Sequence, residues 1–181
     1  MNYAHIYTNS IVDGPGVRVS LYTSGCRNCC KGCHNPETWD FNFGKLYTED
    51  SEKEILNALN HDYIKGFTLS GGDPLEEESQ KVIVNLCRKI KELYPDKDIW
   101  CWTGYEYNDL ISGGKKHCEV TDELLSYIDV LVVGKFILEL RDISDNNRWR
   151  GSTNQRVIDM NETRKQGHIV MMKDIPNNDN Y

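Results

Sequence analysis

The sequence has no long apolar run and no excess of positive charge, and each absence excludes a class of protein. No stretch approaches the roughly 20 apolar residues that a membrane-spanning helix needs, so we expect no transmembrane segment. Lysine and arginine number 21 against 28 aspartates and glutamates, which gives a net charge of -7. Because nucleic-acid binding relies on a cationic surface, we expect neither a DNA nor an RNA partner.

The first residues also lack the basic stretch and apolar core of a secretory signal peptide. We therefore expect a cytoplasmic protein, in which thiols stay reduced. The sequence contains no internal repeat, and 181 residues are typical of one domain. We expect a single domain over residues 1–176 and a disordered tail over 177–181.

Four of the seven cysteines lie within eight residues: Cys26, Cys29, Cys30 and Cys33. Clustered thiols in a reducing compartment indicate metal or redox chemistry rather than disulfides. The spacing Cys26-x3-Cys30-x2-Cys33 places three soft thiolates on one short loop, as an iron-sulfur cluster requires. Such clusters usually have four thiolate ligands, so three would leave one iron open to a substrate or cofactor.

A structural zinc site is the main alternative, because Cys26-x2-Cys29 matches half of one. The second pair of zinc ligands is missing, since Cys101 and Cys118 are distant and unpaired in spacing. We interpret Cys29 as a bystander to the other three thiols.

Hydrophobic patterning predicts strands that alternate with helices. The predicted strands cover residues 17–23, 66–69, 99–103, 129–133, 156–158 and 168–171. The predicted helices cover residues 50–60, with Asp50 as N-cap, 76–93 and 121–127. This alternation favours an α/β fold, an incomplete TIM-type barrel of about five or six β/α units with mostly parallel strands. Loops that follow parallel strands meet at one edge of the sheet, so the cysteine loop and the turn 70–74 should lie close together.

The cysteine spacing after the first predicted strand resembles the signature of the radical S-adenosylmethionine (SAM) superfamily. Residues 13–18 and 23–26 resemble the opening of its glycyl-radical-enzyme activases. Residues 30–35, followed by Thr38 and Trp39, are similar to the variant in activating proteins of anaerobic ribonucleoside-triphosphate reductase. The resemblance extends through several ordered motifs from about residue 13 to residue 159.

The resemblance implies a [4Fe-4S] cluster on Cys26, Cys30 and Cys33, with SAM bound beside it. The turn 70–74 resembles the Gly-Gly-Glu-Pro motif that binds the SAM amino group, with aspartate in place of glutamate. Residues 102–105 and 129–136 match two further family motifs, the second of which places a lysine near the SAM carboxylate or ribose. The residues expected to contact SAM are His34, Asn35, Ser70, Gly71, Gly72, Asp73, Thr103 and Lys135.

Three segments depart from the family pattern or lack a role. Gly32 occupies the position of the superfamily's aromatic residue, so His34 is assigned to the adenine. Val133 replaces an aspartate, and residues 150–157 resemble a late family motif without a role that the sequence identifies. Each motif also has a purely structural interpretation: a turn at 70–74, a buried strand end at 102–105 and a solvent-exposed Lys135.

The resemblance implies an activase that cleaves SAM reductively and forms a glycyl radical on the large subunit of anaerobic ribonucleoside-triphosphate reductase. The electron would come from a flavodoxin- or ferredoxin-like donor. Three alternatives remain open: an activase of another glycyl radical enzyme such as pyruvate formate-lyase, a radical SAM enzyme acting on a small molecule, and a non-catalytic iron-sulfur or zinc protein. The last would need a fourth protein ligand.

Overall fold

The computed structural model describes residues 1–144 and 148–173, which form a mixed sheet flanked by helices. The strands are β1 (Asn2–Ser10), β2 (Val17–Thr23), β3 (Lys45–Leu46), β4 (Ile64–Gly71), β5 (Asp98–Trp102), β6 (Val130–Val133) and β7 (Arg156–Asp159). The helices are α1 (Glu49–Leu59), α2 (Glu77–Leu93), α3 (Tyr107–Leu110), α4 (Thr121–Tyr127) and α5 (Met160–Gln166), with 3-10 turns η1 (Pro36–Trp39) and η2 (Leu138–Leu140). The predicted disordered tail, 177–181, lies outside the described residues.

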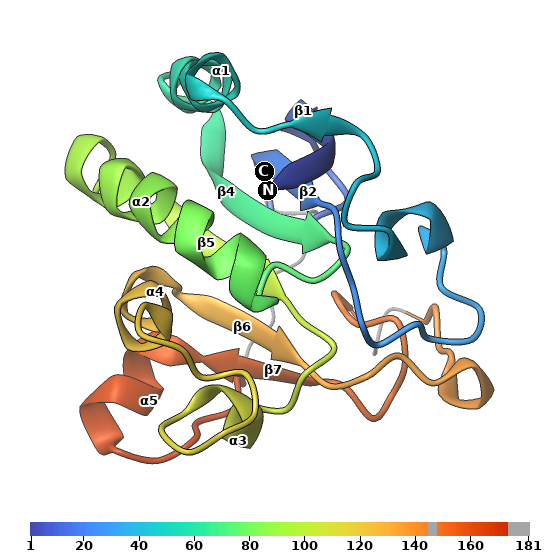
Figure 1. Ribbon diagram of the computed structural model, residues 1–181. Coiled ribbons are helices and arrows are strands. Elements are labelled where there is room, and N and C mark those ends of the chain that lie inside the picture. Colours follow the sequence, from blue (N-terminus) through green and yellow to red (C-terminus); the bar gives the residue numbers. More distant parts are fainter. Residues whose placement is uncertain (145–147, 174–181) are drawn as a thin grey trace.

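The strands are arranged in the order β3-β1-β2-β4-β5-β6-β7 (Figure 1). The four central strands, β2, β4, β5 and β6, are parallel neighbours. Helical segments join them, with α1 before β4, α2 before β5, and α3 and α4 before β6. Parallel neighbours need such long crossovers, because a tight turn can join only antiparallel strands. The predicted α/β fold with a mostly parallel sheet is therefore confirmed for the centre of the molecule.

The predicted incomplete TIM-type barrel is not confirmed, and the sheet of the described residues does not close. Strands β3 and β7 lie at its two edges, whereas a barrel pairs every strand on both sides. The prediction of five or six β/α units was also too high, since the parallel run has four strands. Strand β7 pairs antiparallel with β6, with Val132 opposite Val157, and this reversal ends the series of crossovers.

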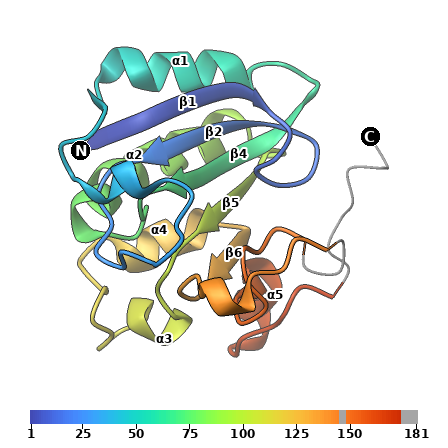
Figure 2. The ribbon, with the colours of Figure 1, turned by 90° about the vertical axis from the view of Figure 1, so that its right-hand side faces the viewer.

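The two faces of the sheet bury different side chains, as the two-residue period of a strand requires. On β5, Ile99 and Cys101 join the main apolar core with residues of α1, α2 and α4, whereas Trp100 belongs to a smaller cluster on the opposite face. Figures 1 and 2 show α1 and α2 along the same side of the sheet. Val133 is fully buried in the main core, so the position where the family pattern has an aspartate is apolar in this chain.

Each predicted range except 168–171 coincides with a helix or strand, whereas β1, β3, α3 and α5 were not predicted. Helix α1 is capped by Thr48, which exchanges hydrogen bonds with Ser51, so the prediction of Asp50 as N-cap was wrong. The expected strand 168–171 is reduced to a single bridge between Ile158 and Met171. Strand β1 pairs antiparallel with β2. It was not predicted, because its mixed polar and aromatic sequence gives little hydrophobic signal.

The ends of β2, β4, β5 and β6 place their following loops at one edge of the sheet, as expected for parallel strands. The segments that follow β2 and β6 lie on the same side of the molecule in Figure 1, and Figure 2 views them from that side. Within the part of the chain that the structure describes, no helix combines the length and apolar character needed to cross a bilayer.

Candidate iron-sulfur and cofactor site

A cavity of about 670 Å³ opens at this edge of the sheet and brings most of the predicted site residues together. The predicted residues that line it are Cys26, Cys30, Cys33, His34, Ser70, Gly71, Gly72, Asp73 and Thr103. Cys29 is absent from this lining, as are Asn35 and Lys135. The three thiols predicted as ligands therefore share a cavity with the Gly-Gly-Asp turn, and the fourth thiol does not.

The cysteine loop begins where β2 ends and is fixed to the turn η1. The amide of Cys26 donates a hydrogen bond to the carbonyl of Trp39, in η1, at 3.2 Å. Within the loop, the amide of Cys33 donates to the carbonyl of Cys30 at 3.0 Å. Cys30 is buried, whereas Cys29 is exposed and has a φ of 43°. This left-handed conformation is uncommon for a residue other than glycine.

The thiols suit a cluster better than a single metal ion. Among the described residues, no three histidine, cysteine, aspartate or glutamate side chains converge on one ion. A [4Fe-4S] cluster does not require such convergence, because each thiolate binds a different iron. Burial and the charge of Asp73 raise the pKa of Cys26 to about 12, and burial also raises that of Cys30. Binding of iron to Cys26 or Cys30 must therefore displace a proton from that thiol.

The carboxylate of Asp73 is 1% exposed and is fully engaged within the protein. Oδ1 accepts hydrogen bonds from the amide of Leu75 at 3.0 Å and the hydroxyl of Thr103 at 2.8 Å. Oδ2 accepts from the amide of Gly104 at 2.9 Å and the side chain of Asn28 at 3.0 Å. Burial raises the pKa of Asp73 to about 6, although hydrogen bonds from Gly104, Thr103 and Leu75 oppose the shift. Asp73 thus joins three loops at the cavity wall.

The two glycines of the turn are required by close backbone packing. Gly71 has a φ of 100°, and a Cβ there would lie 2.6 Å from the backbone of Thr23. A Cβ on Gly72 would lie 2.6 Å from the carbonyl oxygen of Gly25. The amide of Gly72 donates to the carbonyl of Thr23 at 2.8 Å, so the turn is bonded directly to the start of the cysteine loop.

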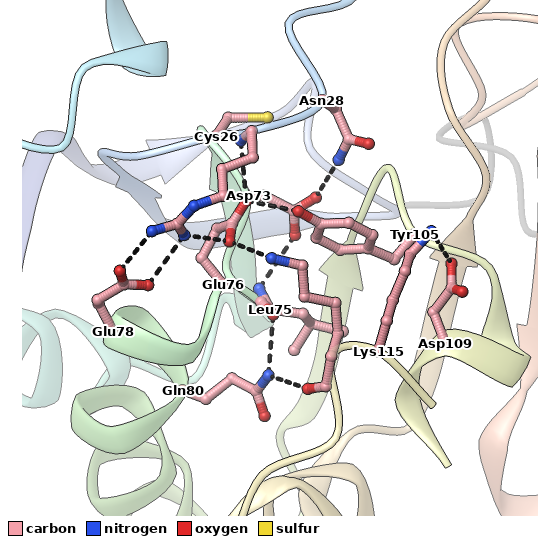
Figure 3. A network of polar contacts seen from close by, with 12 residues as sticks. Cys26, Asn28, Asp73, Leu75, Glu76, Glu78, Gln80, Tyr105, Asp109 and Lys115 are labelled. Atoms are coloured by element: carbon pink, nitrogen blue, oxygen red, sulfur yellow. Dashed lines mark hydrogen bonds and ion pairs between the residues drawn. The ribbon is translucent and has the colours of Figure 1, made fainter. Parts of the chain in front are cut away.

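Glu76, which the sequence analysis did not select, is a second buried carboxylate beside the cavity (Figure 3). It accepts hydrogen bonds from Arg27, Tyr105 and Lys116. Burial raises the pKa of Glu76, but these hydrogen bonds outweigh it and leave the pKa below its ordinary value. The sequence carries no signal for this role, because Arg27 lies 49 residues earlier and an acidic residue at a helix start has an ordinary explanation in the helix dipole.

Aromatic side chains supply a further part of the lining that sequence reasoning did not assign to the cavity: Trp39, Trp102, Phe136 and Trp149. Trp102 stacks on Trp100, with ring centroids 5.5 Å apart, and its indole nitrogen donates to the carbonyl of Trp149 at 2.8 Å. These contacts fix the orientation of the Trp102 ring at the cavity wall.

Two expected SAM contacts lie outside the cavity lining. The carbonyl of Asn35 accepts hydrogen bonds from the amide and hydroxyl of Thr38, so Asn35 shapes the turn η1. Lys135 is exposed, yet its charge lies close enough to Cys30 to lower the pKa of that thiol and partly offset the effect of burial.

The segment 150–157 supports the chain that follows β6. The side-chain oxygen of Gln155 accepts from the amide of Gly151 at 2.8 Å, and its nitrogen donates to the carbonyl of Gly134 at 2.9 Å. Asn154 donates to the carbonyl of Lys135 at 2.9 Å. The structure therefore identifies a role for this motif, which is to hold the backbone of Gly134 and Lys135 beside the cavity.

Comparison with known proteins identifies the family. A family described as a 4Fe-4S single cluster domain matches residues 12–158. The anaerobic ribonucleoside-triphosphate reductase-activating protein of Enterobacteria phage T4 is 41% identical over 157 residues, covering 87% of this chain and 93% of that protein. The proteins of the same name from Vibrio cholerae and Escherichia coli K12 are each 43% identical, over 86% and 87% of this chain and 96% and 97% of their own lengths.

The family match extends from before β2 into β7 and includes the cysteine loop and the Gly-Gly-Asp turn. The identities exceed 40% over more than 150 residues in each case. The chain therefore belongs to the family of anaerobic ribonucleoside-triphosphate reductase-activating proteins and contains a 4Fe-4S single cluster domain.

Proposed function

We propose that this protein is a radical SAM activase that forms a glycyl radical on the large subunit of anaerobic ribonucleoside-triphosphate reductase. The observation that carries the proposal is the shared cavity of Cys26, Cys30, Cys33 and the Gly-Gly-Asp turn, from which Cys29 is absent. The name of the relatives supports the reductase as target. A donor of the flavodoxin or ferredoxin class would supply the electron.

The donor set fits a [4Fe-4S] cluster, with Cys26, Cys30 and Cys33 as the residues that would hold it. When bound, the cluster would supply the single electron for reductive cleavage of the S–C5′ bond of SAM to methionine and a 5′-deoxyadenosyl radical. The protein's contribution is to orient SAM and to keep water and oxygen away. Hydrogen abstraction from a glycine Cα would then give 5′-deoxyadenosine and the glycyl radical.

The residues of the cavity wall divide into two groups for SAM binding. Ser70, Gly71 and Gly72 line the cavity with little side-chain bulk and allow a ligand to approach the backbone closely. Asp73 and Thr103 bond to each other at 2.8 Å, and we assign them to holding the wall in place. His34 lines the cavity and stays assigned to the adenine.

Lys135 has a different place in the proposal. It is exposed and its charge acts on Cys30, so it would meet the carboxylate of SAM from outside the cavity lining. The side chain of Asn154 donates a hydrogen bond to its carbonyl and so holds its backbone in place.

The test is glycyl radical formation on the large subunit of the reductase. The anaerobically reconstituted protein is mixed with that subunit, SAM and a reductant, and the organic radical is recorded by EPR. The proposal predicts a doublet that collapses when glycine deuterated at Cα is incorporated, with deuterium appearing in 5′-deoxyadenosine. A protein that forms 5′-deoxyadenosine without this radical would act on another target, and the reductase assignment would be wrong.

A further inference from the structure

Two buried carboxylates on the connection between β4 and α2 hold two consecutive residues of the cysteine loop. Glu76 binds Arg27, and Asp73 binds Asn28. Arg27 and Asn28 directly follow Cys26, the first of the proposed cluster ligands. The loop is therefore attached at its beginning to residues that lie more than 40 positions later in the chain.

Glu76 is 0% exposed and binds both the backbone and the side chain of Arg27. Its Oε1 accepts from the Arg27 amide at 2.8 Å, and its Oε2 accepts from the guanidinium at 2.6 Å. Tyr105 donates to Oε1 and Lys116 to Oε2, each at 2.6 Å. Figure 3 shows Tyr105 beside Glu76 in this network. Two cations and two neutral donors thus compensate the buried charge, and hydrogen bonds between charged groups are the stronger kind.

The guanidinium of Arg27 is held on three sides although its side chain is 51% exposed. It donates to Glu78 at 2.7 Å as well as to Glu76, and it lies 4.3 Å from the centre of the Phe41 ring. Phe41 follows the turn η1, to which Cys26 is also hydrogen-bonded. Arg27 therefore connects α2, the cysteine loop and the segment after η1 at one point.

The second half of the loop is held more loosely. Lys31 is 82% exposed and pairs at 3.7 Å with Glu139, which is itself 68% exposed. Exposed pairs of this kind contribute little to stability. The contacts thus fix the position of Cys26 before metal arrives, while Cys29 remains exposed and Cys33 partly exposed.

We propose that Arg27, anchored by the buried carboxylate of Glu76, is a positioning residue that holds the loop at Cys26 ready for the cluster. Ordering a flexible loop costs conformational entropy, and contacts that order it in advance reduce what metal binding must supply. Without the Arg27 guanidinium, Glu76 would keep its hydrogen bonds from Tyr105 and Lys116. The fold would therefore persist, while the cysteine loop would open more often. The proposal rests on the proposed ligand set, but its test does not require SAM cleavage.

The test compares Arg27→Gln with a matched control, Arg88→Gln. Arg88 lies on α2, away from the cysteine loop, and pairs with Glu123 on α4. The Arg88 side chain is 41% exposed, close to the 51% of Arg27. The first readout uses metal-free, reduced protein: the rate at which iodoacetamide alkylates Cys26, followed by peptide mass spectrometry. The second is the rate of iron loss from reconstituted protein to a chelator, and the third is the thermal midpoint of the metal-free protein.

We expect Arg27→Gln to raise the alkylation rate of Cys26 by about tenfold, because loss of a charged contact shifts local opening by that order. Iron loss should accelerate in parallel, and the thermal midpoint should match that of Arg88→Gln. Both variants keep the backbone bond to Glu76, and Arg27→Lys also keeps the positive charge, so it should fall between wild type and Arg27→Gln. Equal alkylation and iron loss in Arg27→Gln and Arg88→Gln would overturn the proposal.

Unfolding of Arg27→Gln would also contradict it, because the proposed role is confined to the loop. The metal-free alkylation result stands independently of the enzymatic assignment. If the wild-type protein fails to cleave SAM while Arg27→Gln shows faster alkylation of Cys26, the proposed function is wrong and the positioning role survives. If the wild-type protein cleaves SAM while Cys26 of Arg27→Gln is alkylated no faster than that of Arg88→Gln, only the positioning role is wrong.

Discussion

The side chain of Asn28 donates a hydrogen bond of 3.0 Å to the buried carboxylate of Asp73, 45 residues later in the chain. The same carboxylate binds the strand end at Thr103 and Gly104. The motif that resembles a SAM-binding turn is thus also the joint between the cysteine loop and two strands. This double role changes what substitutions in the turn are expected to do.

Replacing single cysteines should separate ligands from the bystander. We expect Cys26→Ala, Cys30→Ala and Cys33→Ala each to abolish SAM cleavage and to lower bound iron strongly. Cys29→Ala should retain both, since Cys29 is exposed and outside the cavity lining. Iron and sulfide analysis after anaerobic reconstitution, with 5′-deoxyadenosine measured in parallel, checks this. Equal loss in all four variants would show that the ligand set is wrong.

Asp73→Ala should destabilise the metal-free protein, beyond any effect on SAM. The substitution leaves four donors, those of Asn28, Leu75, Thr103 and Gly104, without their acceptor. Buried donors without partners cost about 1–3 kcal/mol each before relaxation, so we expect a loss of several kcal/mol. Urea unfolding of the metal-free protein measures it. A variant with wild-type stability but weakened SAM binding would instead assign the carboxylate to the cofactor.

The raised pKa of Asp73, to about 6, predicts a specific pH dependence of stability. A carboxyl whose pKa is higher in the folded state favours folding when protonated, so its contribution appears as the pH falls through 6 and is lost as the pH rises. Between pH 7 and pH 5, the wild type should gain about 1 kcal/mol relative to Asp73→Asn. Urea titrations of both metal-free proteins at the two pH values test this, and a constant difference would contradict it.

Alanine substitutions at Gly71 and Gly113 can be compared to measure how tightly the turn at Gly71 is packed. Both have positive φ, but a Cβ at Gly71 would meet the backbone of Thr23 at 2.6 Å, whereas a Cβ at Gly113 would meet nothing within 4 Å. Gly113→Ala should therefore cost only the conformational strain, about 1 kcal/mol. Gly71→Ala should cost about 3 kcal/mol or more, because the backbone must also move apart. Similar unfolding free energies for both variants would mean that the turn is more adaptable than its packing indicates.

The sequence predicted the parts of the fold that depend on local patterns. Buried strands such as 129–133 and the amphipathic helix α2 carry their own signal, and the cysteine spacing is contiguous. The direction of β7 was not predictable, because its four residues carry no local pattern that favours parallel over antiparallel pairing. Its antiparallel pairing with β6 ends the run of parallel strands.

The site divides in the same way. Its thiols and glycines follow from motifs, whereas the anchors of the loop depend on distant pairs such as Arg27 with Glu76. Nothing in the order of the residues indicates that the first of three helix-opening glutamates is buried and the third exposed. Burial of that kind is decided by tertiary packing, which only the structure describes.

The central claim, an iron-sulfur cluster that binds and cleaves SAM, is tested most directly on the isolated protein. The protein is reconstituted anaerobically with iron and sulfide, reduced with dithionite and mixed with SAM. Its EPR spectrum is then recorded with and without SAM, and 5′-deoxyadenosine is measured by chromatography. We expect SAM to alter the spectrum of the reduced cluster and 5′-deoxyadenosine to form. A cluster whose spectrum ignores SAM, with no 5′-deoxyadenosine, would contradict it and favour an electron carrier.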